Sequence, residues 1–270
     1  MYQQSSSYEC GPYALKHALQ MLGVFTDERC LGAIAGTSGA GTDEVQLGRA
    51  AARVGCDLPM VRATDPSGAR RVLDAQLARG TPALLCVDQW DHWIAVVGGD
   101  ENRYSVLDSA DPAVVSVMPW PTLATRWGYR EPGAAGLPST YYDVHPVVLR
   151  GKAPAGGGLG ADTAALLRQP HHRQLVRDWP VYSRALLSLA AAAAPGNGEP
   201  TAVALADLLA EQRHRLLDLA AGRRLARRLA ADAELERVRL VARTYGLRVL
   251  REKSRPVLLG VAELVRGLVG

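Results

Sequence analysis

The sequence lacks the features that define several large classes of protein. No uninterrupted apolar run approaches the roughly 18–20 residues that a membrane-spanning helix needs. The nearest run is ALLSLAAAAAP at 185–195. Met1 is not followed by the basic and then apolar stretch of a secretory signal, and a G-x-x-x-x-G-K-[ST] phosphate-binding loop is missing. We therefore expect a cytoplasmic protein without a membrane span.

Cysteine is scarce, and its spacing excludes two further classes. The chain has four cysteines, Cys10, Cys30, Cys56 and Cys86, without a C-x-x-C pair or a histidine ladder beside them. Zinc sites and disulfide-rich domains need such clusters. We expect reduced thiols and no bound metal.

What is present is ordinary globular composition with an uneven charge. The 270 residues are 48% hydrophobic and 21% charged, enough for one large domain or two moderate ones. The net charge of +4 combines a net charge of −4 on residues 1–150 with +8 on residues 151–270, by count of Lys, Arg, Asp and Glu. The two halves therefore differ in character.

Periodicity in the first half predicts helices followed by strands. Apolar spacing and glycine stops favour helices over 10–23, 41–55 and 67–80, with Thr42 as the expected cap of the second. From residue 82 the pattern alternates, which favours strands over 82–87, 92–98, 103–108, 113–118 and 140–149. The turn-prone GDEN at 99–102 makes 92–108 a hairpin. Helices followed by an antiparallel sheet form an α+β domain.

The second half is predicted to be helical. The segments 151–163 and 194–200 are rich in glycine or proline and predict breaks. Beyond them the chain is rich in Ala, Leu, Arg and Glu, with leucines at helical spacing, and Pro256 is expected near the start of a last helix. The leucines are Leu205, Leu209, Leu216, Leu225 and Leu229. We expect a domain over 1–150, a linker with room for a short helix over 151–200, and an all-helical domain over 201–270.

The basic stretch RRLARR at 223–228 has two interpretations. Positive charge suits nucleic acid. The helical spacing of its arginines, however, is typical of a solvated face or of a face that docks a protein. We favour the second interpretation and do not expect nucleic-acid binding.

Three residues of the first half could form a nucleophilic site. Cys10 lies at the amino end of the first helix, where the helix dipole favours a thiolate. His92 begins one hairpin strand and Asp108 ends the next, so their side chains can meet on one face. A base held by a carboxylate activates a thiol for acyl transfer. The backbone amide of Cys10 and the side-chain amide of Gln4 are candidate donors to the resulting oxyanion.

The residues around these positions resemble a known family. The segment from Gln4 through Cys10-Gly11-Pro12, then GTDEVQLGRAAARVG, then DHWIAVVGGDENRYSVLD is similar to the bacteriocin-processing cysteine peptidases. These are papain-like domains that cleave leader peptides after a double glycine. The resemblance covers roughly residues 1–150, and the chain resembles a freestanding member with an added helical region.

The resemblance implies a role for each residue. Cys10 matches the nucleophile, His92 the base, Asp108 the orienting acid, and Gln4 the oxyanion-hole glutamine. Members commonly have Asp-Pro at the third triad position, so Asp111, 19 residues after His92 and followed by proline, is an alternative acid.

The sequence therefore predicts a papain-like cysteine peptidase that needs no cofactor and acts on a peptide or protein. Cleavage after small residues, as at a Gly-Gly leader site, is implied by the resemblance. Two alternatives stay open: an acyl transferase or deamidase that uses the same residues, and a catalytically idle module that binds a peptide.

Overall fold

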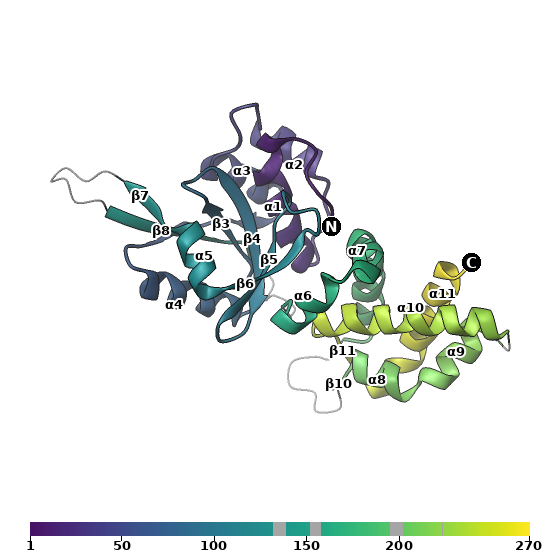
Figure 1. Ribbon diagram of the computed structural model, residues 1–270. Coiled ribbons are helices and arrows are strands. Elements are labelled where there is room, and N and C mark those ends of the chain that lie inside the picture. The colour runs from purple at the N-terminus through teal and green to yellow at the C-terminus, as the bar shows by residue number, and fades with distance from the viewer. Residues whose placement is uncertain (132–138, 152–157, 195–201, 223) are drawn as a thin grey trace. The chain divides into compact units, whose positions relative to one another are not determined.

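A computed structural model describes residues 1–131, 139–151, 158–194, 202–222 and 224–270 (Figure 1). The chain divides into two compact units, Met1–Arg177 and Asp178–Gly270. In the described residues no helix is both long and apolar enough to cross a membrane.

The first unit contains most of the strands. Its helices and 3₁₀ turns are η1 (Ser7–Glu9), α1 (Cys10–Met21), α2 (Glu28–Ala35), α3 (Glu44–Arg53), α4 (Pro66–Leu77), α5 (Trp120–Trp127), α6 (Ala161–Leu167) and η2 (Pro170–His172). Its strands are β1 (Cys56–Asp57), β2 (Val61–Ala63), β3 (Ala83–Val87), β4 (His92–Gly99), β5 (Arg103–Leu107), β6 (Val115–Pro119), β7 (Tyr129–Glu131), β8 (Ser139–Pro146) and β9 (Val148–Leu149).

One antiparallel sheet organises this unit. Its strands lie in the order β2-β8-β3-β4-β5-β6, with β7 also paired to β8, while β1 and β9 form a separate pair. The predicted hairpin is confirmed as β4 and β5, which are joined through residues 100–102. Both hairpin strands are therefore interior strands of the sheet, with β4 at its centre.

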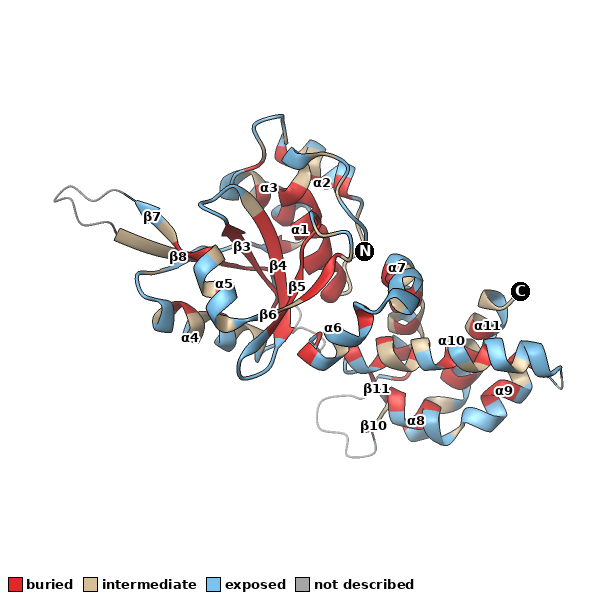
Figure 2. Ribbon diagram, in the orientation of Figure 1, coloured by how far each residue is buried: buried red, intermediate tan, exposed pale blue. Residues whose placement is uncertain are grey.

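Helices cover both faces of the sheet. Side chains alternate along a strand, and those of Leu85, Ile94 and Val106 pack with Leu73 of α4 and Trp127 of α5 in one buried cluster. Helix α1 contacts β4 and β3. Figure 2 shows α1 and the central strands as the most buried part of the unit.

Helix α1 is buried along its whole length. All twelve residues are buried, including Lys16, whose ammonium lies 2.5 Å from a carboxylate oxygen of buried Glu28. The Tyr2 hydroxyl donates to the same carboxylate at 2.7 and 2.9 Å. A buried charge is tolerated when it is paired and hydrogen-bonded. The ion pair between Lys16 and Glu28 therefore allows the helix expected at 10–23, which the sequence predicts as amphipathic, to be buried on every side.

Helix α3 begins one residue later than the sequence indicated. Asp43, and not Thr42, is the N-cap: its carboxylate accepts from the Gln46 N–H at 2.7 Å, and the Gln46 side chain accepts from the Asp43 N–H at 2.8 Å. This reciprocal capping box satisfies two backbone donors at once. Thr42 instead shares a hydrogen bond with Thr37 and offers its carbonyl to Trp93.

The segment expected to be a linker contains two helices. Residues 152–157 and 195–200 lie outside the described residues, but α6 and α7 (Arg173–Ala191) occupy most of the stretch between them, and the boundary between the two units falls inside α7. Leu159 is fully buried against β4, where its N–H donates to the Val97 carbonyl at 3.2 Å. A Cβ at Gly98 would lie 2.3 Å from the Leu159 oxygen, so glycine is required for this close approach.

The second unit consists mainly of helices. The carboxyl-terminal part of α7 is joined by β10 (Ala202–Ala204), α8 (Leu205–Glu211), α9 (Arg213–Ala221), α10 (Leu225–Thr244), β11 (Arg248–Leu250), η3 (Arg251–Lys253) and α11 (Ser254–Leu268). The strands β10 and β11 form a short antiparallel ribbon that the sequence did not indicate. Pro256 lies in the first turn of α11, as predicted.

Two of the five leucines at helical spacing are exposed. Leu205, Leu209 and Leu216 are buried, whereas Leu225 is 71% and Leu229 64% exposed. The buried face of α10 contains Ala231, Leu235, Val238 and Ala242. An α-helix has 3.6 residues per turn, so the same face nearer the start of α10 contains Arg228 and Arg224. The two leucines each follow one of these arginines and are therefore rotated by about 100° around the helix axis, away from the buried face.

The predicted α+β class is confirmed, with helices and an antiparallel sheet followed by a helical region.

Candidate active site

Cys10 is the first residue of α1, as the sequence predicted. The 3₁₀ turn Ser7–Glu9 leads directly into the helix, and Glu9 is its N-cap residue. Cys10 is 4% exposed. A Cβ at Gly11 would lie 3.1 Å from Thr42 and 3.4 Å from Trp93, so the small residue lets the start of α1 approach both elements. The thiol therefore lies at the positive end of a buried helix dipole.

An unusual turn precedes His92. Asp88, Gln89 and Trp90 all have positive φ, between 55° and 66°, which is costly for residues other than glycine. The segment 126–130 contacts each of them: Arg126 forms a bidentate pair with Asp88, the Gln89 amide donates to the Gly128 carbonyl, and the Trp90 ring stacks 3.8 Å from that of Tyr129. These contacts stabilise the turn and so fix the position of His92, which is the first residue of β4.

His92 and Asp108 form a direct pair. The His92 Nε2 lies 2.7 Å from the Asp108 Oδ1, and the two side chains are 13% and 10% exposed. Pairing of Ala95 with Leu107 places Asp108, one residue further, opposite Ile94, so His92 and Asp108 meet diagonally on one face. The hairpin thus brings the two residues together as predicted, although they lie diagonally across the strands and not directly opposite each other.

The protonation of this pair follows from its surroundings. Burial lowers the pKa of His92, but hydrogen bonds to Asp108 and to the Cys10 side chain, with the charges of both, outweigh burial and raise it to about 9. Burial raises the pKa of Asp108, and the hydrogen bond from His92, the Ala110 N–H and the charge of Arg126 outweigh it, so that pKa is lowered. The site therefore contains an imidazolium and a carboxylate at neutral pH. Because Nε2 contacts Asp108, Nδ1 is the nitrogen left for Cys10.

Asp111, the alternative acid, has another partner. Its Oδ1 accepts from the Ala113 N–H at 2.8 Å, which closes the turn after β5. Among the described residues, the carboxylate that contacts His92 is that of Asp108.

Gln4 lies beside the loop that follows β5. Its backbone N–H donates to the Ser109 carbonyl at 2.9 Å, and its Oε1 accepts from the Ser109 hydroxyl at 2.6 Å. Its Nε2 donates to the carbonyls of Ser6 and Ser7, at 2.9 and 3.2 Å. The amide is thus held between the residue after Asp108 and the turn before Cys10, with both N–H groups engaged.

Two residues absent from the sequence-based site support it. Arg126 contacts Asp108 Oδ2 at 3.5 Å in addition to Asp88, and Ser109 orients Gln4. No spacing pattern identified Arg126, because it belongs to a different element, α5. Ser109 could have been suspected, since it follows the predicted acid directly.

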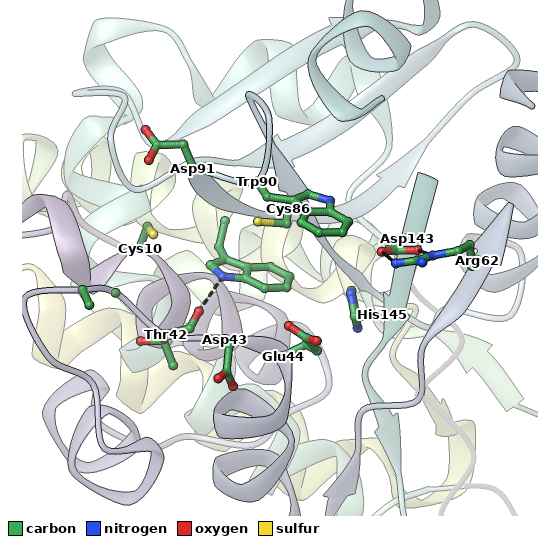
Figure 3. Close-up of a pocket in the computed structure, with 13 residues that line it drawn as sticks. Cys10, Thr42, Asp43, Glu44, Arg62, Cys86, Trp90, Asp91, Asp143 and His145 are labelled. Atoms are coloured by element: carbon green, nitrogen blue, oxygen red, sulfur yellow. Dashed lines mark hydrogen bonds and ion pairs between the residues drawn. The ribbon is translucent and has the colours of Figure 1, made fainter. Parts of the chain in front are cut away.

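A pocket of about 320 Å³ opens beside Cys10 (Figure 3). Its lining includes Cys10, Trp93 and residues of α3 and β8, but not His92, Asp108 or Gln4. The Trp93 indole N–H donates to the Thr42 carbonyl at 2.8 Å, which fixes one wall.

The remaining cysteines differ from Cys10 in their surroundings. Cys30 is exposed, Cys56 is buried, and Cys86 lines the pocket. Burial, and then the charges of Cys10 and Glu44, raise the pKa of Cys86 to about 12, so it stays a thiol. Cys10 is the cysteine that adjoins the histidine.

Comparison with known proteins gives likeness at the level of structure. No protein-family model matches the chain, and no curated protein sequence matches it. Among solved structures, the peptidase domain of Streptococcus ComA, a bi-functional ABC transporter of a quorum-sensing pathway, is 15% identical; the match covers 55% of this chain and 97% of that domain, with a TM-score of 0.41.

Two further structures are similar to the same extent. A double-glycine-motif protease from an AMS/PCAT transporter, solved with a leader peptide, is 16% identical, with coverage of 54% and 90% and a TM-score of 0.40. The peptidase domain of Streptococcus mutans ComA is 16% identical, with coverage of 53% and 97% and a TM-score of 0.36. These three structures are peptidases or peptidase domains, and each match leaves nearly half of this chain uncovered.

Proposed function

We propose that this protein is a papain-like cysteine peptidase in which Cys10 is the nucleophile, His92 the general base and acid, and Asp108 the residue that orients His92. Gln4 and the Cys10 backbone N–H are the proposed oxyanion donors. The observation that supports the proposal most strongly is the buried His92–Asp108 pair, 2.7 Å long, together with the position of Cys10 at a helix amino end and its contribution to the raised pKa of His92.

The proposed attack uses Cys10 as a thiolate. With a pKa of about 9, His92 is protonated at neutral pH, and an imidazolium beside a cysteine is a general means of stabilising a thiolate. The sulfur would attack the carbonyl carbon of a peptide bond, and His92 would give its proton to the leaving amine. The products of this step are a thioester on Cys10, a free amine and a neutral imidazole.

The second half of the cycle needs His92 as a base. The charge of Cys10 is one of the contributions that raise the pKa of His92. A thioester has no such charge, so acylation lowers that pKa, and more of the imidazole is in the neutral form that can accept a proton from the incoming water. Water then replaces the sulfur on the acyl carbon, and the proton it loses returns to His92.

The oxyanion role of Gln4 requires a small rearrangement. Both Nε2 hydrogens donate to carbonyls in the turn that precedes Cys10. An oxyanion would compete with one of these carbonyls, and a charged acceptor makes the stronger hydrogen bond. Ser109, which accepts the backbone N–H of Gln4 and donates to its Oε1, would keep the amide in place during the exchange.

The substrate class is proposed on the sequence resemblance. We expect a peptide or protein with small residues before the cleaved bond, such as a Gly-Gly leader site. The exposed Arg224 and Arg227 at the start of α10 remain a candidate docking face for a protein partner; Arg223 lies outside the described residues.

Product mass tests the proposal. Purified protein is incubated with a peptide library that contains Gly-Gly sites, and the products are analysed by mass spectrometry beside Cys10→Ala and Cys30→Ala variants. Peptidase activity predicts two fragments whose masses sum to the substrate plus one water, lost in Cys10→Ala and kept in Cys30→Ala. An intact peptide that gains about 1 Da would support deamidation, and cleavage that persists in Cys10→Ala would refute the proposal.

A further inference from the structure

The pocket beside Cys10 carries an excess of negative charge. Its described lining contains the carboxylates of Asp43, Glu44, Asp91 and Asp143, against one guanidinium, that of Arg62. Arg62 forms two hydrogen bonds of 2.7 Å to Asp143, and its guanidinium lies 4.8 Å from the Tyr141 ring centroid. The one cation of the wall is therefore neutralised and held, so the remaining carboxylates determine the charge that the pocket presents.

Glu44 is the carboxylate best placed to meet a ligand. Asp43 is occupied as the cap of α3, whereas the Glu44 side chain is exposed and has no hydrogen bond or ion pair with any described residue. Figure 3 shows Glu44 and His145 as neighbours in the lower part of the pocket. The electrostatic effect of Glu44 on His145 also places the two groups near each other.

His145 is an independent sign of a ligand. The residue is 3% exposed and lines the pocket, yet within the described part of the chain its ring nitrogens form no hydrogen bond; its ring contact is with Trp93, at 5.3 Å. Buried polar groups are normally satisfied. Burial lowers the pKa of His145, so the ring is neutral at physiological pH and offers a lone pair as well as an N–H.

The shape of the pocket suits a long side chain with a polar end. Trp90 and Trp93 line the pocket, and Figure 3 shows Cys10 on one side of them and His145 on the other. Lys and Arg bury their methylene stems along apolar surface and place the charge where it is solvated or paired. A carboxylate next to a neutral imidazole nitrogen provides two acceptors for such a cation.

We propose that this pocket is a substrate subsite for a cationic side chain, lysine or arginine, whose charged end donates to Glu44 and His145. The inference rests on the proposed peptidase function, because the pocket adjoins the proposed nucleophile. It adds a specificity that small residues at the cleaved bond do not supply: a basic residue a short distance away on the same peptide.

Peptidyl acyloxymethyl ketones provide the test. The Cys10 sulfur forms a bond to the methylene carbon of such a reagent, and a carboxylate leaves. Each reagent ends in glycine, and one of the three preceding positions carries lysine, norleucine or glutamate. Alkylation rates at Cys10 are measured for the natural chain, Glu44→Gln and Glu101→Gln. Glu101 is an exposed carboxylate that does not line this pocket, and it is the matched control.

Each rate is divided by the rate of the same variant with iodoacetamide, so that changes in thiolate reactivity cancel. At one of the three positions we expect lysine to react about tenfold faster than norleucine, the effect of one charge-assisted hydrogen bond, and glutamate to react slowest. The preference for lysine is expected to disappear in Glu44→Gln and to persist in Glu101→Gln. Equal rates for lysine and norleucine at all three positions, or a preference that survives Glu44→Gln, would overturn the subsite.

The experiment distinguishes a result that contradicts the proposed subsite from one that contradicts the proposed peptidase function. Rapid iodoacetamide labelling of Cys10 without a lysine preference contradicts the subsite alone. If Cys10 does not label rapidly, the peptidase proposal falls, and the pocket is tested by calorimetry on Cys10→Ala with the corresponding peptides. Tighter binding of the lysine peptide than of the norleucine and glutamate peptides supports a cation site, and equal binding refutes it.

Discussion

Replacement of Asp108 by asparagine tests the electrostatics of the site. The substitution keeps the shape of the side chain and removes the charge that lies 2.7 Å from the His92 Nε2. A change in the His92 pKa from its ordinary value of 6.5 to about 9 corresponds to about 3 kcal/mol of preference for the imidazolium. Since an opposite charge at this range shifts a pKa by about one to three units, we expect Asp108→Asn to lower the His92 pKa by about two units.

The assay is a titration of the six histidines by NMR, with His92→Gln to assign the signal. The natural chain should show one imidazole that titrates near pH 9, and Asp108→Asn should move that signal and no other. His145, whose pKa burial lowers, is an internal reference on the same sheet. A His92 signal that titrates near pH 6.5 in the natural chain, or one unmoved by Asp108→Asn, would refute the ion pair.

The raised pKa of His92 also makes the free energy of unfolding depend on pH. The folded-state pKa of His92 lies above the unfolded value, so its contribution to the free energy of unfolding, up to about 3 kcal/mol, is complete below about pH 6.5. It is lost as the pH rises through about 9. The difference in unfolding free energy between the natural chain and His92→Gln should therefore shrink over this interval.

Three further substitutions follow from the site and the fold. Gln4→Ala should lower kcat for peptide cleavage roughly 100-fold with little change in KM, the usual effect of removing an oxyanion donor; an unchanged kcat would remove Gln4 from the mechanism. Asp111→Asn should change kcat/KM less than about twofold and lower the unfolding free energy by about 1 kcal/mol, because it weakens one hydrogen bond to the Ala113 N–H; a large loss of activity would make Asp111 the acid. Gly98→Ala should destabilise the first unit by about 2 kcal/mol or more in urea unfolding, because its Cβ would lie 2.3 Å from the Leu159 oxygen; a neutral effect would contradict this packing.

Periodicity predicted the elements that bury one continuous face. The helix that begins at Cys10 and the hairpin of β4 and β5 were found within one or two residues of their bounds. Strands β1 and β2 were missed because they have two and three residues, too few for an alternating pattern. The ribbon of β10 and β11 was missed because its partners are more than forty residues apart and lie in Ala- and Leu-rich sequence that also suits helix.

In the candidate site, sequence order and strand geometry predicted the pairing of His92 with Asp108. They did not predict the residues that hold this pair in place. The position of His92 and Asp108 on neighbouring hairpin strands was enough to bring them together. Arg126 was not predictable, because its contacts depend on how α5 packs against the sheet. The three left-handed residues before His92 were also hidden, since none is glycine and tertiary contacts impose their conformation.

The sequence pattern alone does not decide whether the Cys10 thiol faces the core or His92, and the surroundings of Cys10 do. The same Cys-Gly pair could have begun a helix whose thiol faced the core, as Cys56 does. The contribution of Cys10 to the raised pKa of His92 distinguishes the two cases.

The most direct test of the central claim is the rate at which limiting iodoacetamide labels each cysteine between pH 5 and 9, by intact mass and peptide mapping. It compares the natural chain with His92→Ala and needs no substrate. We predict that Cys10 labels faster than exposed Cys30 below neutral pH and that this advantage disappears in His92→Ala. If Cys10 labels no faster than Cys30, or if its rate is unchanged in His92→Ala, the thiolate–imidazolium pair and the peptidase built on it are wrong.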